Sequence, residues 1–201
     1  VDAGKVQKQL EEFTRAGDNA MAAEDYAKAA SAYRQARDIA KRSSDRKNLE
    51  KKLDEARFRA TLAEGDAARD RQEWSAAEIA YKKALMMRPK DITIPPRLQE
   101  LETLKQYQLH LSKGDEWLNQ GNTAEAIKEY KLAQKVLSKP QVITRIRAAK
   151  YRQNVNTGRG AMAAGKYPEA MAYFLTAKRL NDTDEVRKLI QEVKKAQEGG
   201  K

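Results

Sequence analysis

Residues 61–89 read TLAEGDAARDRQEWSAAEIAYKKALMMRP. In this stretch Gly65 is followed twelve, sixteen and nineteen residues later by Ala77, Tyr81 and Ala84. Side chains three or four positions apart lie on one face of a helix, so the last three residues form a single stripe. The stretch predicts a helical hairpin in which Gly65 on the first helix and Ala77 on the second allow a close crossing, with Tyr81 filling the space beside it.

The same pattern occurs after three further glycines, Gly17, Gly114 and Gly158. The residues twelve and nineteen positions later are always alanine, and the residue sixteen positions later is always aromatic. The corresponding residues are Ala29, Tyr33 and Ala36; Ala126, Tyr130 and Ala133; and Ala170, Phe174 and Ala177. Agreement at every one of these positions indicates an internal repeat, which is typical of a helical solenoid.

The pattern resembles the tetratricopeptide repeat (TPR), and the second copy matches it best because Pro89 also falls in register. The resemblance implies hairpins at about 10–43, 58–91, 107–140 and 151–184. The spacing of Val186, Ile190 and Val193 predicts a capping helix at about 183–197, which a solenoid needs over its last apolar face.

The repeat is longer than in that family. The glycines are 48, 49 and 44 residues apart (65−17, 114−65 and 158−114), against about 34 in the family. The additional residues have a helical pattern. Leu49 and Leu53 share one face of the segment before Gly65, and Leu98 and Leu101 share one face of the segment before Gly114. We therefore predict an all-α fold, a right-handed α-α superhelix (solenoid) of four TPR-like helical hairpins with lengthened first helices plus a C-terminal capping helix, as one domain over residues 1–198.

Composition supports helix and excludes several kinds of site. Apolar residues make up 40% of the 201 residues and charged residues 34%, with only 10 Gly, 5 Pro and no Cys. Disulfides and thiolate metal sites are therefore excluded, and no apolar run reaches the ~18 residues of a membrane span. His110 is the single histidine, and we interpret it as a packing or solvated residue. We predict no catalytic residue, cofactor or metal, and we place Trp74 and Trp117 at core positions of the repeat.

Positive charge gathers in the last third of the chain. The net charge is +11, and Lys139–Lys201 holds 14 basic residues against 6 acidic ones. Arg145, Arg152 and Arg159 recur every seven residues, so they share one helix face, and Asn156 lies one turn away.

The resemblance implies that first helices line a groove in which peptides bind. Arg145, Arg152, Asn156 and Arg159 are therefore candidate partner-binding residues, because Arg grips carboxylates and Asn can hold an extended backbone. Two interpretations stay open: an anion-accepting pocket, or a solvated stripe paired with acids of the preceding hairpin. Residues Thr14, Asp18 and Ala63 depart from the family's chaperone-tail clamp, so we do not expect that ligand.

From the architecture we predict a non-catalytic protein–protein interaction scaffold or adaptor whose partner has an acidic segment. The alternatives are RNA binding or docking to an anionic membrane through the basic third, and self-association also stays open. A start at Val1 is compatible with a processed form or a piece of a longer anchored protein, and the sequence assigns no compartment.

Overall fold

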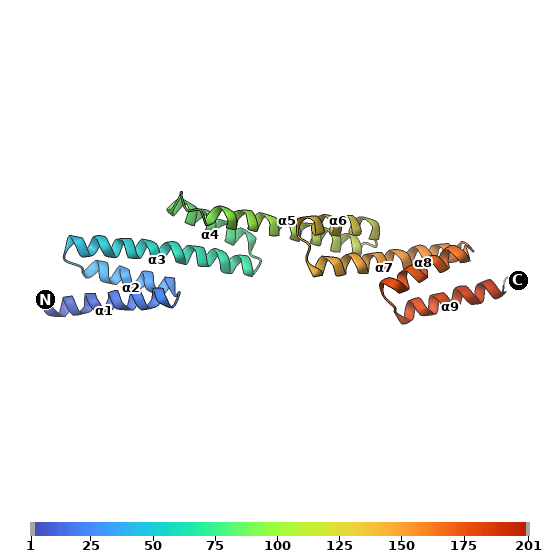
Figure 1. The fold of residues 1–201 in the computed structure, drawn as a ribbon, viewed down its shortest axis with the longest axis horizontal. Coiled ribbons are helices and arrows are strands. Elements are labelled where there is room, and N and C mark those ends of the chain that lie inside the picture. Colours follow the sequence, from blue (N-terminus) through green and yellow to red (C-terminus); the bar gives the residue numbers. More distant parts are fainter. Residues whose placement is uncertain (1–2, 200–201) are drawn as a thin grey trace. The chain divides into compact units, whose positions relative to one another are not determined.

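The structure is a computed structural model that describes the backbone of residues 3–199; Val1 and Asp2, where the predicted domain begins, lie outside this range. The described residues form nine α-helices and no strand (Figure 1). The helices are α1 (Ala3–Ala22), α2 (Tyr26–Ile39), α3 (Ser43–Asp70), α4 (Trp74–Met87), α5 (Ile94–Asn119), α6 (Thr123–Val136), α7 (Pro140–Ala163), α8 (Tyr167–Leu180) and α9 (Asp184–Gly199). The all-helical class and the array of hairpins are confirmed.

The chain packs as two compact units, Val1–Leu101 and Glu102–Lys201. Unit 1 holds α1 to α4 and the first turns of α5, and its helices α1, α2 and α3 lie side by side (Figure 1). Unit 2 holds the rest of α5 and helices α6 to α9, in which α6, α7, α8 and α9 pack in chain order. In both units each helix packs against its neighbour in sequence, as a repeat protein requires.

Each hairpin is closed by an aromatic ring that lies directly over a glycine. The rings of Tyr33, Tyr81, Tyr130 and Phe174 are at most 2% exposed. A Cβ atom added at the paired glycine would stand only 2.4 to 2.6 Å from the nearest ring carbon. From the sequence we predicted that an alanine lies opposite the glycine and that the ring lies beside it. The ring itself takes that place, while the alanines are fully buried next to it.

The turn inside every hairpin uses a left-handed residue seven positions after the glycine. These residues are Glu24 (φ 58°), Gln72 (φ 61°), Gly121 (φ 82°) and Gly165 (φ 70°). In the second turn the amide of Glu73 donates to the carbonyl of Ala68 at 2.9 Å, and the other three turns make the same bond. This is the Schellman arrangement, which satisfies carbonyls left over at the helix end.

Replacing Gln72 by glycine is expected to raise the free energy of unfolding by about 0.5–1 kcal/mol. A left-handed conformation costs a residue with a Cβ atom about 1–2 kcal/mol, and part of that gain is offset by the larger entropy of glycine in the unfolded chain. The midpoint of urea unfolding measures the change. The reciprocal variant Gly121→Gln should lower it by a similar amount, and an increase there would contradict the argument.

The first helices are the long ones, as predicted. They have 20, 28, 26 and 24 residues in α1, α3, α5 and α7, whereas every second helix has 14. The added turns complete the core of the hairpin before them. Leu49, Leu53 and Ala56 of α3 belong to the α1–α2 core, and Ile94 and Leu101 of α5 belong to the α3–α4 core.

Unit 2 repeats this arrangement. Val142 of α7 joins the core of α5 and α6, and Val186 of α9 joins the core of α7 and α8. The predicted capping helix is therefore confirmed as α9. One core prediction was wrong: Trp117 is 37% exposed. The equivalent position, three residues after the crossing glycine, is a buried alanine in the first two hairpins (Ala20 and Ala68). An indole ring is too large for the space that these alanines fill.

Candidate functional site

A hydrogen bond joins the two helices of each of the first three hairpins. The hydroxyl of Tyr33 donates to Asp18 Oδ1 at 2.7 Å, and Tyr81 bonds to Asp66 in the same way at 2.7 Å. In the third hairpin the hydroxyl of Tyr130 donates to Asp115 at 2.6 Å. In each case the aspartate directly follows the glycine under the ring. The ring and its hydroxyl thus fix one crossing by packing and by hydrogen bonding.

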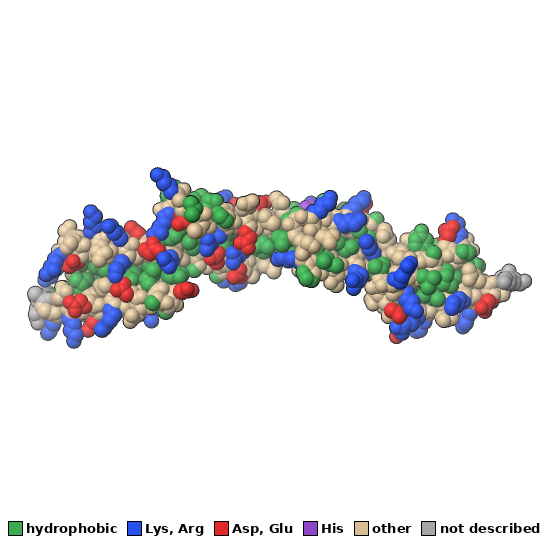
Figure 2. Space-filling model, in the orientation of Figure 1, with side chains coloured by type: hydrophobic (Ala, Val, Ile, Leu, Met, Phe, Trp, Pro, Cys, Tyr) green, Lys and Arg blue, Asp and Glu red, His purple; other side chains and the backbone are tan. Residues whose placement is uncertain are grey.

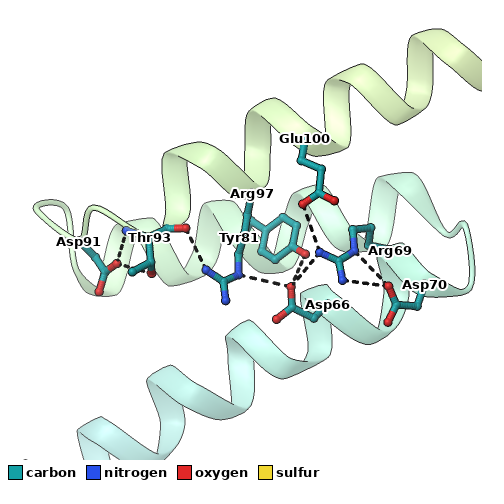
Figure 3. A network of polar contacts seen from close by, with 8 residues as sticks. All are labelled: Asp66, Arg69, Asp70, Tyr81, Asp91, Thr93, Arg97 and Glu100. Atoms are coloured by element: carbon teal, nitrogen blue, oxygen red, sulfur yellow. Dashed lines mark hydrogen bonds and ion pairs between the residues drawn. The ribbon is translucent and has the colours of Figure 1, made fainter. Parts of the chain in front are cut away.

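The same aspartates bind a basic residue on the next first helix. Lys52 Nζ lies 2.7 Å from Asp18 Oδ1, and Arg145 Nε lies 2.9 Å from Asp115 Oδ1. Figure 3 shows the second hairpin, in which Asp66 accepts from Arg97 at 3.3 Å. One carboxylate therefore links three helices, and these polar side chains are occupied inside the fold.

Arg69 extends the network of the second hairpin. Its guanidinium lies 3.5 Å from Asp66, 2.9 Å from Asp70 and 3.4 Å from Glu100 of α5 (Figure 3). Arg97 also donates to the carbonyl of Thr93 at 2.9 Å. These contacts tie the start of α5 to the end of α3 within unit 1.

The network shifts the ionisation of its members. Burial raises the pKa of Asp115, but the hydrogen bonds from Arg145 and Tyr130 together lower the pKa by more than burial raises it. The pKa of Asp115 therefore lies below its ordinary value. Asp18 has a lowered pKa by the same balance, with Lys52 and Tyr33 as its donors. Burial raises the pKa of each bonded tyrosine, and the hydrogen bond to the carboxylate raises it further.

Alkaline titration is expected to ionise Tyr33, Tyr81 and Tyr130 only together with unfolding. Below pH ~10 these tyrosines are neutral in both the folded and the unfolded chain, so stability is fully present. Above that pH the unfolded chain loses phenolic protons that the folded chain keeps, so stability falls as the pH rises toward the raised folded pKa. Phenolate absorbance measured against circular dichroism checks this. The variant Tyr81→Phe should shrink the step that coincides with unfolding, and an unchanged step would contradict the assignment.

The fourth hairpin has a basic residue where the other three have the aspartate, and its contacts differ accordingly. Arg159 stands where the other hairpins have aspartate, and its ring is Phe174, which has no hydroxyl to donate. Arg159 pairs with Glu185 of α9, whose carboxylate lies 2.8 Å from Arg159 Nη2. Glu185 stands one helical turn before Leu189, which holds the place that Arg145 has on α7. Glu185 also accepts from the hydroxyl of Tyr151 at 3.1 Å. Among the four hairpins of the described residues, the one that α9 covers has its basic residue on its own first helix and the acidic partner on the next helix.

The four predicted binding residues therefore lie in two different situations on α7. Arg145 pairs with Asp115 of the preceding hairpin, and Arg159 pairs with Glu185 of α9. Arg152 and Asn156 are exposed, and the side chain of neither makes a hydrogen bond or ion pair with another residue in the described part of the chain. Each residue of the first pair is bound to a carboxylate of another helix, while the second pair is open to solvent. Partner binding by all four stays a prediction.

Unit 1 contains two hollows between successive first helices that were not predicted from the sequence. The larger, of about 630 Å³, is lined by Phe58, Leu62 and Ala63 of α3 and by Arg97 at the start of α5. The smaller, of about 420 Å³, lies between α1 and the start of α3 and is lined in part by Leu10.

Leu10 and Phe58 both stand seven residues before the crossing glycine, so the two hollows occupy equivalent places in the repeat. In the larger hollow Arg88 lies over the ring of Phe58, with 4.0 Å from Cζ to the ring centroid, and its guanidinium binds Glu55. Arg59 binds the same carboxylate at 2.6 Å. The hollow therefore has an apolar floor and a rim of positioned charges, which suits a polypeptide segment.

Other site chemistry is sparse in the part of the chain that the structure describes. His110 is half-buried, and its Nδ1 lies 2.8 Å from Glu129 Oε2. Across residues 3–199 no three His, Cys, Asp or Glu side chains are grouped so that they could hold a metal ion. None of the helices in that range combines the length and apolar character needed to cross a membrane.

No family model and no curated protein matches the chain. Among solved structures, a TPR repeats protein from Bacteroides fragilis is similar, with 17% sequence identity and a TM-score of 0.30. The likeness covers 92% of this chain and 97% of that one.

Proposed function

We propose that this protein is a non-catalytic scaffold that binds a protein segment along its first helices. The observation that carries the proposal is the pair of hollows in unit 1, which occupy equivalent places in successive repeats. A polypeptide laid across the first helices of unit 1 would meet one such hollow in each of its two hairpins. Apolar floors would take side chains, and the positioned charges of Glu55 and Arg59 would orient the segment.

We further propose that an acidic stretch of the partner contacts α7. Arg152 and Asn156 are exposed and lie one helical turn apart, so one guanidinium can bind a carboxylate while the amide holds the backbone. Arg145 and Arg159 flank them on the same face and add positive potential, although each is already paired with a carboxylate. In this proposal Arg152 and Asn156 make the direct contacts, and the outer two arginines act at longer range.

The test uses fluorescence anisotropy of the full chain with a library of labelled acidic peptides. The variant Arg152→Glu is expected to weaken binding by about tenfold or more, because it replaces attraction by repulsion. The matched control Arg147→Glu makes the same charge change at an exposed position on another face of α7, and it should leave affinity within about twofold.

Equal losses of peptide affinity in Arg152→Glu and Arg147→Glu would mean that binding depends only on net charge, and the proposed contact with α7 would be wrong. Labelled single-stranded RNA distinguishes the nucleic-acid alternative. If RNA bound more tightly than every peptide and its affinity fell steeply with salt, the protein-scaffold proposal would be wrong.

A further inference from the structure

The three most exposed large apolar side chains among the described residues lie close together in sequence, in unit 1. Ile79 is 68% exposed, Met86 is 77% exposed and Ile92 is 85% exposed. Ile79 and Met86 are seven residues apart on α4 and share a face, and Ile92 lies in the connection between α4 and α5. Figure 2 shows hydrophobic side chains gathered over the turn between these two helices. We call these three residues the α4 patch.

The hairpin fold does not need an apolar residue at these positions of α4. The positions of Ile79 and Met86 stand fourteen and twenty-one residues after the crossing glycine. At the same places the other hairpins have Ser31 and Asp38, Lys128 and Lys135, and Ala172 and Arg179. Two large apolar side chains at these places are therefore peculiar to the second hairpin and do not stabilise its core. Exposed apolar side chains that gather in this way mark an interaction surface.

The segment that carries the α4 patch has a net positive charge. Residues 78–93, which span the patch, contain four basic side chains and two acidic ones, Glu78 and Asp91. Lys82 and Lys83 lie on the exposed face of α4 between Ile79 and Met86. Lys82 binds Glu78 at 2.6 Å, whereas Lys83 and Lys90 are exposed and form no ion pair with any residue in the range 3–199. The surface thus offers apolar side chains beside cationic ones, which is complementary to an anionic, partly apolar partner.

We propose that the α4 patch docks onto the surface of a bilayer that contains anionic lipid. A specific protein interface uses about 20–30 residues from each side, far more than the few side chains gathered here. A bilayer needs no complementary shape, because the apolar side chains enter the acyl boundary while lysines stay among anionic headgroups. Met86 suits this role because its unbranched thioether side chain adapts to an irregular surface.

The chain has no cysteine, so a single introduced thiol reports on a single position. Met86→Cys and Ile92→Cys are labelled with an environment-sensitive fluorophore and mixed with phosphatidylcholine vesicles, with and without phosphatidylserine. Both probes are expected to shift to the blue only with phosphatidylserine present. The same probe at Leu132→Cys, on an exposed apolar position of α6 in unit 2, should not shift.

A second measurement separates the α4 patch from the basic third of the chain, which also attracts anionic lipid. The triple variant Ile79→Ser/Met86→Ser/Ile92→Ser keeps the net charge and is expected to lower vesicle partitioning by about tenfold or more. The matched triple variant Leu132→Ser/Ile143→Ser/Leu175→Ser changes exposed apolar residues of unit 2 and should leave it within about twofold.

Unshifted probes at both Met86→Cys and Ile92→Cys on phosphatidylserine vesicles would overturn the proposal. Equal partitioning of the wild-type chain and the α4-patch variant would also overturn it, and would assign vesicle binding to the basic third. Probes that respond to an acidic amphipathic peptide and not to vesicles would assign the surface to a protein partner instead. None of these outcomes depends on the hollows or on Arg152, so the scaffold proposal is tested separately.

Discussion

Replacing Gly158 by alanine is expected to lower the free energy of unfolding by about 2–3 kcal/mol. The new Cβ atom would stand 2.5 Å from Cε1 and 2.8 Å from Cδ1 of Phe174. That ring is fully buried between α7, α8 and α9, so it cannot move aside without opening the crossing. The loss exceeds the ~1 kcal/mol that alanine ordinarily adds to a helix in place of glycine. Urea unfolding followed by circular dichroism measures it.

Gly160 provides the matched control, since it lies two residues further along the same helix. An added Cβ atom there would meet nothing within 4 Å. Gly160→Ala should therefore raise stability by up to about 1 kcal/mol through helix propensity alone. One substitution made at two positions of α7 is thus expected to act in opposite directions. A loss of stability in both variants would mean that the ring does not limit the crossing.

Replacing Asp115 by arginine is expected to cost about 3 kcal/mol. The buried hydroxyl of Tyr130 would lose its acceptor, and the half-buried Arg145 would face a second guanidinium in place of its carboxylate. Thermal and urea unfolding measure the loss. Tyr130→Phe alone should cost only about 1 kcal/mol, because it removes one hydrogen bond and leaves the ion pair with Arg145 in place.

The triple variant Asp115→Arg/Tyr130→Phe/Arg145→Glu is expected to recover most of that loss, to within about 1 kcal/mol of the wild type. It would restore an ion pair between the two helices with the charges exchanged, as Arg159 and Glu185 form between α7 and α9. Recovery would show that the ion pair between positions 115 and 145 stabilises the fold with its charges in either order. If the triple variant were no more stable than Asp115→Arg alone, the sign of the charge at each position would matter and the ion pair alone would not account for the stability.

The hairpins could be predicted from the sequence because the signal is local and repeated. Gly65, Ala77, Tyr81 and Ala84 act through helix periodicity, which the sequence displays directly. The same holds for Leu49 and Leu53, whose spacing predicted the additional turns of α3 and which are buried. The exchange of places between ring and alanine could not be predicted, since periodicity assigns a face of a helix but not the depth at which each side chain lies.

The candidate site was predicted less completely. A seven-residue spacing placed Arg145 and Arg159 on one face of α7, but it did not show which acids of other helices reach them. Asp115 is thirty residues from Arg145 in sequence, so the pairing depends on how two helices stack. The hollows of unit 1 had a signal that could have been used, because Leu10 and Phe58 stand at the same place before their glycines.

The unequal lengths of the two kinds of helix determine where the chain can be divided. A fragment that ended after α2, at the boundary of the sequence repeat, would lack Leu49, Leu53 and Ala56 and would leave the apolar faces of α1 and α2 in water. A fragment that continued to Ala56 would keep that core whole. Truncations of this protein should therefore end in the middle of the long helices and not in the loops, which sequence alignment alone would suggest.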